Sequence, residues 1–318
     1  MEKVAIGIDI GGTNTTIGFV NQQGEILRKS SVKTSTNPDI STFIKEIYDC
    51  IEENLKAANN LSIEGIGIGA PNGNYYQGTI EHAPNLAWKG IVNLTDEFSK
   101  LTPKPVFVTN DANAAAMGEM LFGNAKEMKN FVVITLGTGL GSGFVVNGDI
   151  LYGHDGFAGE LGHTIVQVDG RSCGCGRKGC LETYVSAPGI CRTAISILEK
   201  STQKSVLRDY TKETLNSEII FNAAKANDEI ALKAFDFTAN ILGKELADMI
   251  AITSPEAIFL FGGLAYSGKY IFEPTQKYIE EYIHNIFRNK VKLLPSGLPE
   301  NDAAILGAAA LAWNELKK

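Results

Sequence analysis

Two stretches of the chain share one hydrophobic pattern: a run of β-branched and other apolar residues, a turn of glycine and threonine, and a second apolar run. The first is VAIGIDIGGTNTTIGFV at residues 4–20, and the second is FVVITLGTGLGSGFVV at Phe131–Val146. Such runs, bounded by turn residues, predict buried strands. A third strand is expected to follow each stretch, after the turns at 21–24 and 147–149. The pattern therefore predicts an internal pseudo-repeat.

Residues 40–57 show the periodicity of an amphipathic helix. Their large apolar side chains recur every three or four positions, which places them on one face. These side chains are Phe43, Ile44, Ile47, Ile51 and Leu55. A strand, GIGIGAP, is predicted next at Gly65–Pro71.

The second half of the chain predicts longer helices, at 187–199, 217–225 and 229–252. A buried strand, AIFLFGG, begins at Ala257. In the last helix, DAAILGAAALAWNEL, Asp302 can serve as the N-cap and the small residues permit close packing.

Composition and charge narrow the class of protein. The chain has 318 residues, of which 44% are hydrophobic, so it can bury a sizeable core and exceeds the usual size of one domain. Its net charge of -7 argues against binding to nucleic acid or a membrane surface. The N-terminus lacks the apolar stretch of a signal peptide, which favours a cytoplasmic location. We expect the partners to be small molecules and further copies of the chain.

A metal-ligand pattern lies in HTIVQVDGRSCGCGRKGCLE, which runs from His163 to Glu182. Cys173, Cys175 and Cys180 are spaced by glycines, and His163 precedes them. Three thiolates and one imidazole suit a closed tetrahedral zinc site. The alternatives are a disulfide or buried free thiols. Neighbouring C-x-C cysteines rarely reach disulfide geometry, and three thiols leave one unpaired, so zinc is favoured.

The first glycine turn carries a candidate phosphate site. Asp9 precedes a loop with little side-chain bulk, which consists of Gly11, Gly12, Thr13 and Asn14. Backbone N–H groups can approach phosphate oxygens there, and the carboxylate can orient Mg²⁺ or its water shell. A glycine turn of this kind is also common as a purely structural connection between strands.

Five motifs together resemble the ROK family of bacterial sugar kinases and repressors. They occur in the order of that family and cover nearly the whole chain. They are DIGGTNTTIG at Asp9–Gly18, NDANAAAMGE at Asn110–Glu119, LGTGLGSG at Leu136–Gly143, GELGH followed by CGCGRKGCLE between Gly159 and Glu182, and FGGLA at Phe261–Ala265. The resemblance implies an α/β fold of the actin-like, sugar-kinase type, with two α/β domains flanking an active-site cleft.

The resemblance also assigns roles to residues. It implies that Asp111 is the general base and that Asn110 holds neighbouring sugar hydroxyls, although the Asp111 carboxylate could alternatively cap a helix. It implies further sugar contacts from Glu160, His163 and Glu182. The alternative for Glu160 and Glu182 is that they are solvated surface carboxylates. Asn72 and Gly73 are weaker sugar candidates, because many family members have a more glycine-rich turn at this place.

Further glycines are assigned to the nucleotide. Gly137, Thr138 and Gly139 resemble the second phosphate loop of the family, and Gly262 and Gly263 resemble the turn that contacts adenosine. Because the last helix returns to the N-terminal domain in this family, we expect a smaller domain of residues 1–112 plus 301–318 and a larger one of residues 113–300.

The expected activity is ATP-dependent phosphorylation of the 6-hydroxyl of a hexose, with Mg²⁺ accompanying ATP and Zn²⁺ as a structural ion. Glucose is the first choice, and the alternatives are N-acetylmannosamine, N-acetylglucosamine, fructose and allose. A sugar-responsive repressor is less favoured, because the first motif already begins at residue 9 and leaves little chain before it for a DNA-binding domain. The family further implies a homodimer.

Overall fold

The first sheet has five strands in the order β3-β2-β1-β4-β8. β2 and β3 are antiparallel to their neighbours, whereas β1, β4 and β8 run parallel. The strands are β1 (Glu2–Ile10), β2 (Asn14–Val20), β3 (Ile26–Lys33), β4 (Leu61–Gly69) and β8 (Val106–Thr109). β4 begins earlier than the predicted strand at 65–71, because its pairing with β1 starts where Leu61 meets Glu2.

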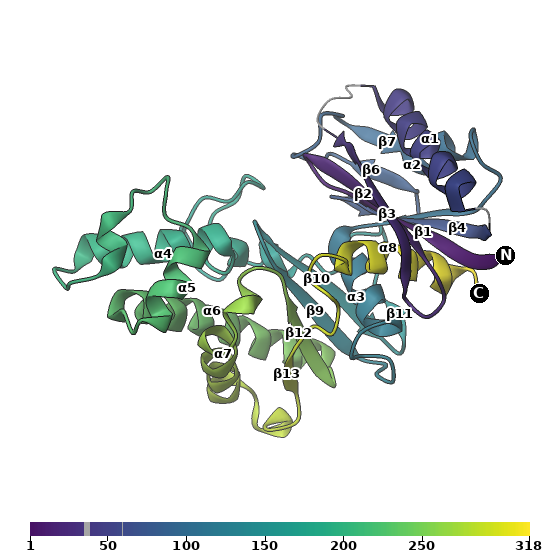
Figure 1. The fold of residues 1–318 in the computed structure, drawn as a ribbon. Coiled ribbons are helices and arrows are strands. Elements are labelled where there is room, and N and C mark those ends of the chain that lie inside the picture. Colours follow the sequence, from purple (N-terminus) through teal and green to yellow (C-terminus); the bar gives the residue numbers. More distant parts are fainter. Residues whose placement is uncertain (35–38, 59) are drawn as a thin grey trace. The chain divides into compact units, whose positions relative to one another are not determined.

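The second sheet repeats this order as β11-β10-β9-β12-β13. Its strands are β9 (Phe131–Leu136), β10 (Leu140–Val146), β11 (Asp149–Ile150), β12 (Ala257–Phe261) and β13 (Lys292–Pro295). β9, β10 and β11 take the places of β1, β2 and β3. The predicted pseudo-repeat and both third strands are therefore confirmed (Figure 1).

The helices are α1 (Ile40–Ala58), α2 (Leu94–Ser99), α3 (Asp111–Leu121), α4 (Ala187–Lys200), α5 (Ser217–Lys225), α6 (Glu229–Thr253), α7 (Lys269–Tyr282) and α8 (Ala303–Glu315). The helices predicted from the hydrophobic pattern occur with nearly the expected bounds, whereas α2 and α7 were not predicted. A small sheet of β5 (Gly73–Asn74), β6 (Thr79–Glu81) and β7 (Ile91–Asn93) lies outside the predicted elements. Among the described residues, no helix combines the length and the apolar character needed to cross a membrane.

The computed structural model describes residues 1–34, 39–58 and 60–318. Their contacts form two units. The first consists of residues 1–129, 143–159 and 297–318, and the second of residues 130–142 and 160–296.

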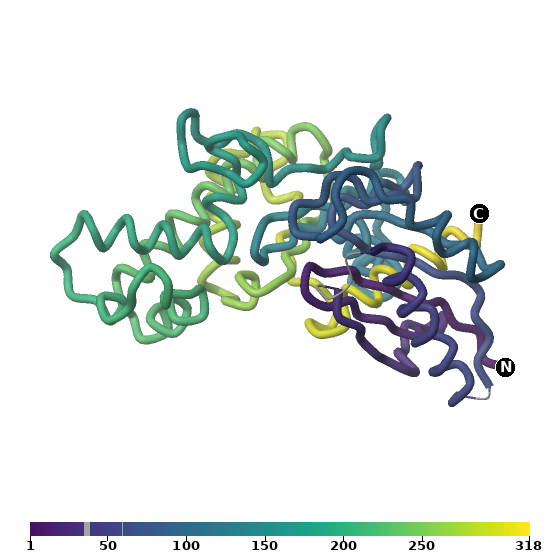
Figure 2. The backbone as a smooth tube through the Cα atoms, turned by 90° about the horizontal axis from the view of Figure 1, so that it is seen from above, coloured from purple at the N-terminus to yellow at the C-terminus, as the bar shows by residue number. Residues whose placement is uncertain are grey.

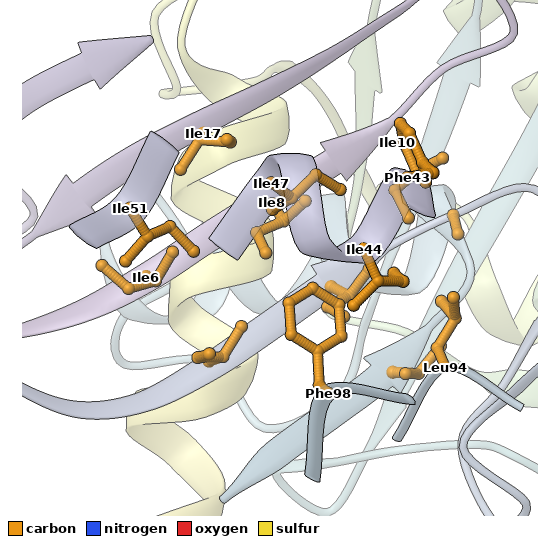
Figure 3. Close-up of a cluster of buried hydrophobic side chains, with 14 of the residues drawn as sticks. Ile6, Ile8, Ile10, Ile17, Phe43, Ile44, Ile47, Ile51, Leu94 and Phe98 are labelled. Carbon is orange, nitrogen blue, oxygen red and sulfur yellow. The ribbon is translucent and has the colours of Figure 1, made fainter. Parts of the chain in front are cut away.

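The core of the first unit lies between α1 and the first sheet. Phe43, Ile44, Ile47 and Ile51 of α1 are buried, as the helical periodicity predicted. They pack with isoleucines of β1 and β2 and with Phe98 of α2 (Figure 3). Each fully buried side chain of this size contributes about 1.5–3 kcal/mol to folding, so this cluster holds the strand ends that carry the site.

The C-terminal helix α8 packs on the same sheet and also contacts α3. Figure 2 shows its yellow trace beside the purple N-terminal strands. Glycines in the strands make this approach possible. A Cβ added to Gly67 would lie 1.9 Å from the carbonyl oxygen of Ala308, and one added to Gly7 would lie 2.2 Å from that of Ile305. The close packing predicted from the small residues of this helix is confirmed.

The predicted capping role of Asp302 is wrong. Asp302 occupies the N-cap position of α8, but within the described chain its side chain makes no capping hydrogen bond. Its carboxylate instead accepts a hydrogen bond from Lys29 Nζ at 2.8 Å. The backbone of Asp302 lies outside the extended conformation of a usual N-cap, so its carboxylate turns to the nearby ammonium group.

Candidate functional site

Two aspartates of the first unit lie at the carboxyl ends of parallel strands. Asp9 of β1 pairs with Gly69 of β4, and Gly69 pairs with Thr109 of β8, so these positions form one row across the sheet. Asp111 follows two residues after Thr109. Gly69 lies between β1 and β8 in this row and has no side chain that could separate the two carboxylates. Ligands of open α/β sheets commonly bind beyond the carboxyl ends of the strands.

Asn110 and Asp111 lie at the start of α3 and make different contacts there. The Asn110 side chain is the N-cap and accepts a hydrogen bond from the Asn113 N–H at 2.7 Å. Asp111 is the first helical residue and is exposed to solvent, with one carboxylate oxygen 2.9 Å from the Ala112 N–H. Asn110 therefore serves as the cap, and the Asp111 carboxylate keeps an oxygen for a ligand. Although part of the residue is exposed, the protein packed around its carboxylate desolvates it and raises the pKa of Asp111, and the backbone hydrogen bonds oppose the rise.

The pKa of the other carboxylate, that of Asp9, is also raised. Desolvation, followed by the negative charge of Asp111, raises the pKa of Asp9 to about 6. Both effects disfavour the anion. A cation bound beside Asp9 would relieve them, which fits the predicted contact with magnesium or its water shell.

The first loop and the Asn72 turn lie beside these strand ends. Gly12, Thr13 and Asn14 are exposed. Asn72 donates a hydrogen bond from Nδ2 to the Glu81 carbonyl at 2.9 Å. Gly73 lies against β8, where an added Cβ would be 2.3 Å from the Thr109 carbonyl oxygen. Gly73 thus lets this turn support the segment that carries Asp111. Its predicted sugar contact, like that of Asn72, stays a prediction.

The second unit holds the predicted metal cluster. One potential ligand atom from each of His163, Cys173, Cys175 and Cys180 lies within 4.8 Å of the others. The sulfurs of Cys175 and Cys180 are 3.7 Å apart, and Cys173 Sγ is 3.7 Å from His163 Nδ1. A tetrahedral zinc ion with Zn–S bonds of about 2.3 Å holds its ligands roughly 3.5–4 Å apart. The residues and their spacing fit a structural zinc ion.

Backbone contacts shape this cluster. The Cys173 N–H donates to the Arg177 carbonyl at 2.9 Å and closes the turn around Cys175. Burial acts to raise the pKa of the Cys175 thiol, but hydrogen bonds from Arg177 and the neighbouring thiols outweigh it and lower the pKa to about 6. Burial raises the pKa of the Cys173 and Cys180 thiols, so among the three cysteines only Cys175 favours the thiolate before a metal binds.

His163 presents its two nitrogens to different neighbours. Nδ1 faces the cysteines and is 3.9 Å from Glu182 Oε1, whereas Nε2 is 3.9 Å from Glu160 Oε2. A metal on Nδ1 would fix the tautomer and leave Nε2–H as a donor on the side of Glu160. The structure thus brings together all three residues predicted to contact sugar in this unit.

The glycines assigned to the nucleotide differ in the space beside their Cα atoms. Gly262 has φ +98°, and an added Cβ would lie 2.8 Å from the Leu136 carbonyl oxygen, so the fold itself requires this glycine. A Cβ on Gly137 or Gly263 would meet no atom of the described residues within 4 Å. Open space beside these two glycines is compatible with a ligand approaching the backbone.

Sequence reasoning missed Arg171. Its guanidinium donates from Nη1 to the carbonyls of Thr183 and Gly189, at 2.9 and 3.0 Å, and stacks over the Tyr184 ring at 4.4 Å. Arg171 therefore fixes the backbone beside Glu182. An arginine between the histidine and cysteines carries no signal of its own, because most arginines are solvated.

Comparisons with known proteins agree with this arrangement. The model of the ROK family matches residues 5–315. A glucokinase of Halalkalibacterium halodurans is 36% identical over 311 residues, covering 96% of this chain and 94% of that protein. A glucokinase of Thermotoga maritima is 35% identical over 308 residues, covering 96% of both chains.

A solved structure shows the same fold. The ROK family glucokinase from Streptomyces griseus, in complex with glucose and AMPPNP, superposes with a TM-score of 0.79 at 32% identity, covering 98% of this chain and 99% of that one. This likeness and the repeated strand order confirm the predicted actin-like, sugar-kinase fold. The match of the family model over almost the whole sequence confirms the resemblance seen in the five motifs. The chain belongs to the ROK family.

Proposed function

We propose that this protein is an ATP-dependent hexose kinase that phosphorylates the 6-hydroxyl of glucose. The observation that carries the proposal is the exposed Asp111 carboxylate at the end of β8, beside Asp9, in a chain similar to glucokinases over nearly its full length. The glucose and AMPPNP bound to the Streptomyces griseus relative support the choice of substrates.

In this mechanism Asp111 acts as the general base. The sugar hydroxyl oxygen attacks the γ-phosphorus in line, its proton passes to the Asp111 carboxylate, and ADP leaves. Phosphoryl transfer depends mainly on positioning and charge stabilisation. A raised pKa suits Asp111 to this role, because a more basic carboxylate accepts the proton more readily.

The sugar is held by hydrogen bonds to its hydroxyls. Asn110 and Asp111 contribute from the first unit, and Glu160, His163 and Glu182 from the second. Carboxylates accept from sugar hydroxyls, and His163 Nε2–H donates to a sugar oxygen. The zinc ion held by His163 and the three cysteines is structural in this proposal. When bound, it would orient the histidine and the backbone that leads to Glu182.

The nucleotide is bound by the glycine turns. Gly11–Asn14 and Gly137–Gly139 contact the phosphates, and Gly262 and Gly263 border the adenosine. Asp9 would orient the Mg²⁺ that accompanies ATP, or its water shell, and the ion would supply positive charge beside the phosphates. The smaller domain of residues 1–112 plus 301–318, the larger domain of 113–300, the cytoplasmic location and the homodimer remain parts of the proposal.

A coupled assay of ADP release tests this function. We expect the highest kcat/KM with glucose among glucose, N-acetylmannosamine, N-acetylglucosamine, fructose and allose. A clear preference for an N-acetylated sugar would reject glucose as the substrate and leave the kinase mechanism intact. No sugar-dependent ADP release with any of the five would reject the kinase and favour a sugar-binding regulator.

A further inference from the structure

Gly139 differs from the other glycines of its loop in what lies beside its Cα. Its φ lies outside the left-handed region that favours glycine. An added Cβ would lie 2.7 Å from Glu182 Oε2, whereas one on Gly137 would meet no described atom within 4 Å. The Glu182 carboxylate therefore occupies the space that a side chain at position 139 would need.

The backbone of Glu182 is held in place. Glu182 belongs to a short 3-10 helix, Leu181–Thr183, which follows the ligand Cys180. Its carbonyl accepts a hydrogen bond from Ser186 Oγ at 2.7 Å, and the next carbonyl, of Thr183, accepts one from Arg171 at 2.9 Å. A side chain at position 139 would thus displace the carboxylate of Glu182 and leave its backbone unchanged.

We propose that Gly139 is a positioning residue for the sugar site. By lacking a side chain it lets the Glu182 carboxylate lie against the nucleotide loop, 3.9 Å from His163 Nδ1. One loop then serves two ligands: its backbone faces the nucleotide, and its missing side chain sets where a sugar-binding carboxylate lies. This inference rests on the proposed sugar contact of Glu182.

The size of the displacement decides its effect. Non-bonded heavy atoms approach to about 3.5 Å, so an alanine at 139 would push the carboxylate by roughly 1 Å. A hydrogen bond stretched by that amount is lost. Cys173 Sγ lies 3.0 Å from Glu182 Oε1, and with zinc bound it would be a thiolate with no proton to donate, so on the zinc-loaded protein the displacement breaks no hydrogen bond. The fold should therefore keep its stability while sugar affinity falls.

Calorimetric titration of glucose without nucleotide tests the proposal on the zinc-loaded protein. We expect Gly139→Ala to weaken glucose binding about 10-fold, the usual effect of losing one hydrogen bond to a charged group. Its melting temperature should equal that of the unsubstituted protein. The matched control is Gly137→Ala, in the same loop, which should raise the KM for ATP and leave the Kd for glucose unchanged.

A double-mutant cycle shows whether the effect passes through Glu182. In a Glu182→Ala background, Gly139→Ala should cause no further loss of glucose affinity. Glu182→Asp, whose shorter chain withdraws from Gly139, replaces the alanine variant if that one binds too weakly to measure.

Three results would overturn the inference. An unchanged glucose Kd in Gly139→Ala would show that the carboxylate position does not depend on this glycine. An equal loss in both backgrounds would show that the effect bypasses Glu182. Failure of the unsubstituted protein to bind glucose or the four other sugars would reject the proposed function, and with it the role of Glu182 on which the inference rests.

Discussion

Asp9 is a residue at which function and stability have opposite requirements. The protein surrounds its carboxylate and places Asp111 near it, so the anion is disfavoured in the free protein. The proposed role beside Mg²⁺ nevertheless needs the anion. Residues of active sites often carry strain or charge that the fold alone would not select.

The pH dependence of activity should show where the Asp9 anion is lost. Because the pKa of Asp9 is raised to about 6, its carboxylate becomes protonated as the pH falls through that value. We expect kcat/KM for MgATP to fall about tenfold per pH unit below this point. A profile that stays flat from about pH 8 to about pH 5 would contradict the role of Asp9.

Thermal stability provides the complementary test. A carboxyl whose pKa is higher in the folded than in the unfolded state binds more protons when folded, so its anion destabilises the fold above its folded pKa. Asp9→Asn should therefore melt at a higher temperature than the unsubstituted protein near pH 8. The gain should shrink toward pH 5, where Asp9 itself is protonated, and a gain independent of pH would point to another cause.

At the scale of elements, the glycines of β1 and β4 set the distance to the C-terminal helix α8. Their missing side chains let the helix backbone approach the sheet, whose strand β1 carries Asp9 and whose strand β8 leads to Asp111. The small residues of α8 complete the contact, since Ala308, Ala309 and Ala312 are fully buried. This packing therefore supports the strand ends that hold Asp9 and Asp111.

Gly67→Ala should destabilise the fold by about 3 kcal/mol, at the upper end of the usual cost of overpacking. Its Cβ would meet the backbone of Ala308, which cannot give way as a side chain could. Gly65→Ala is a matched control in the same strand, because its nearest neighbour is Leu316 Cδ1 at 3.3 Å. Urea denaturation measures both, and equal costs would contradict the proposed contact.

The cysteine cluster should behave as one structural element. We expect about one zinc ion per chain, as in other four-ligand sites. The Cys175→Ala variant should bind no metal, melt at a lower temperature and lose its activity, because the same turn leads to Glu182. Cys50→Ala, a cysteine of α1, is the control and should keep all three. Stoichiometric zinc in an active Cys175→Ala protein would refute the cluster as the site.

Periodicity and turn chemistry predicted the elements of this fold well. The helix at 217–225 and the strand beginning at Ala257 occur as expected, because their patterns are local. The sheet of β5, β6 and β7 escaped prediction, since strands of two or three residues give no periodic signal. Asp302 failed as a cap because a lysine distant in the sequence binds its carboxylate.

The candidate site was predictable in its residues and not in its contacts. The spacing of the cysteines indicated the metal cluster directly, and the motif around Asp111 indicated a base. The register that aligns Asp9 with Thr109, and the contact between Gly139 and Glu182, depend on tertiary structure. No pattern along the chain encodes such contacts.

At the scale of the whole molecule, the proposed reaction uses residues from both units. Asp9 and Asp111 belong to the first, and Glu160, His163 and Glu182 to the second. The two groups have separable tasks, because the first acts on the transferred phosphoryl group and proton, whereas the second recognises hydroxyls. Substitutions in the two units should therefore affect different kinetic constants.

Sugar analogues should reveal the task of the second unit. A site built to hydrogen-bond a hydroxyl penalises an analogue that lacks it, because buried polar groups lose their partners. We expect kcat/KM for glucose to exceed that for its 2-deoxy analogue by about 10-fold or more if Glu182 contacts that hydroxyl. Glu182→Ala should narrow this ratio, and an unchanged ratio would place Glu182 outside contact with that hydroxyl.

The central claim is that Asp111 is the base of a sugar kinase, and the turnover of Asp111→Asn with glucose and ATP tests it most directly. The substitution keeps the shape of the side chain and removes its basicity. We predict a kcat lower by roughly 10²-fold to 10⁴-fold with little change in glucose affinity. A kcat close to that of the unsubstituted protein would contradict the account and leave Asp111 as an ordinary residue of the first turn of α3.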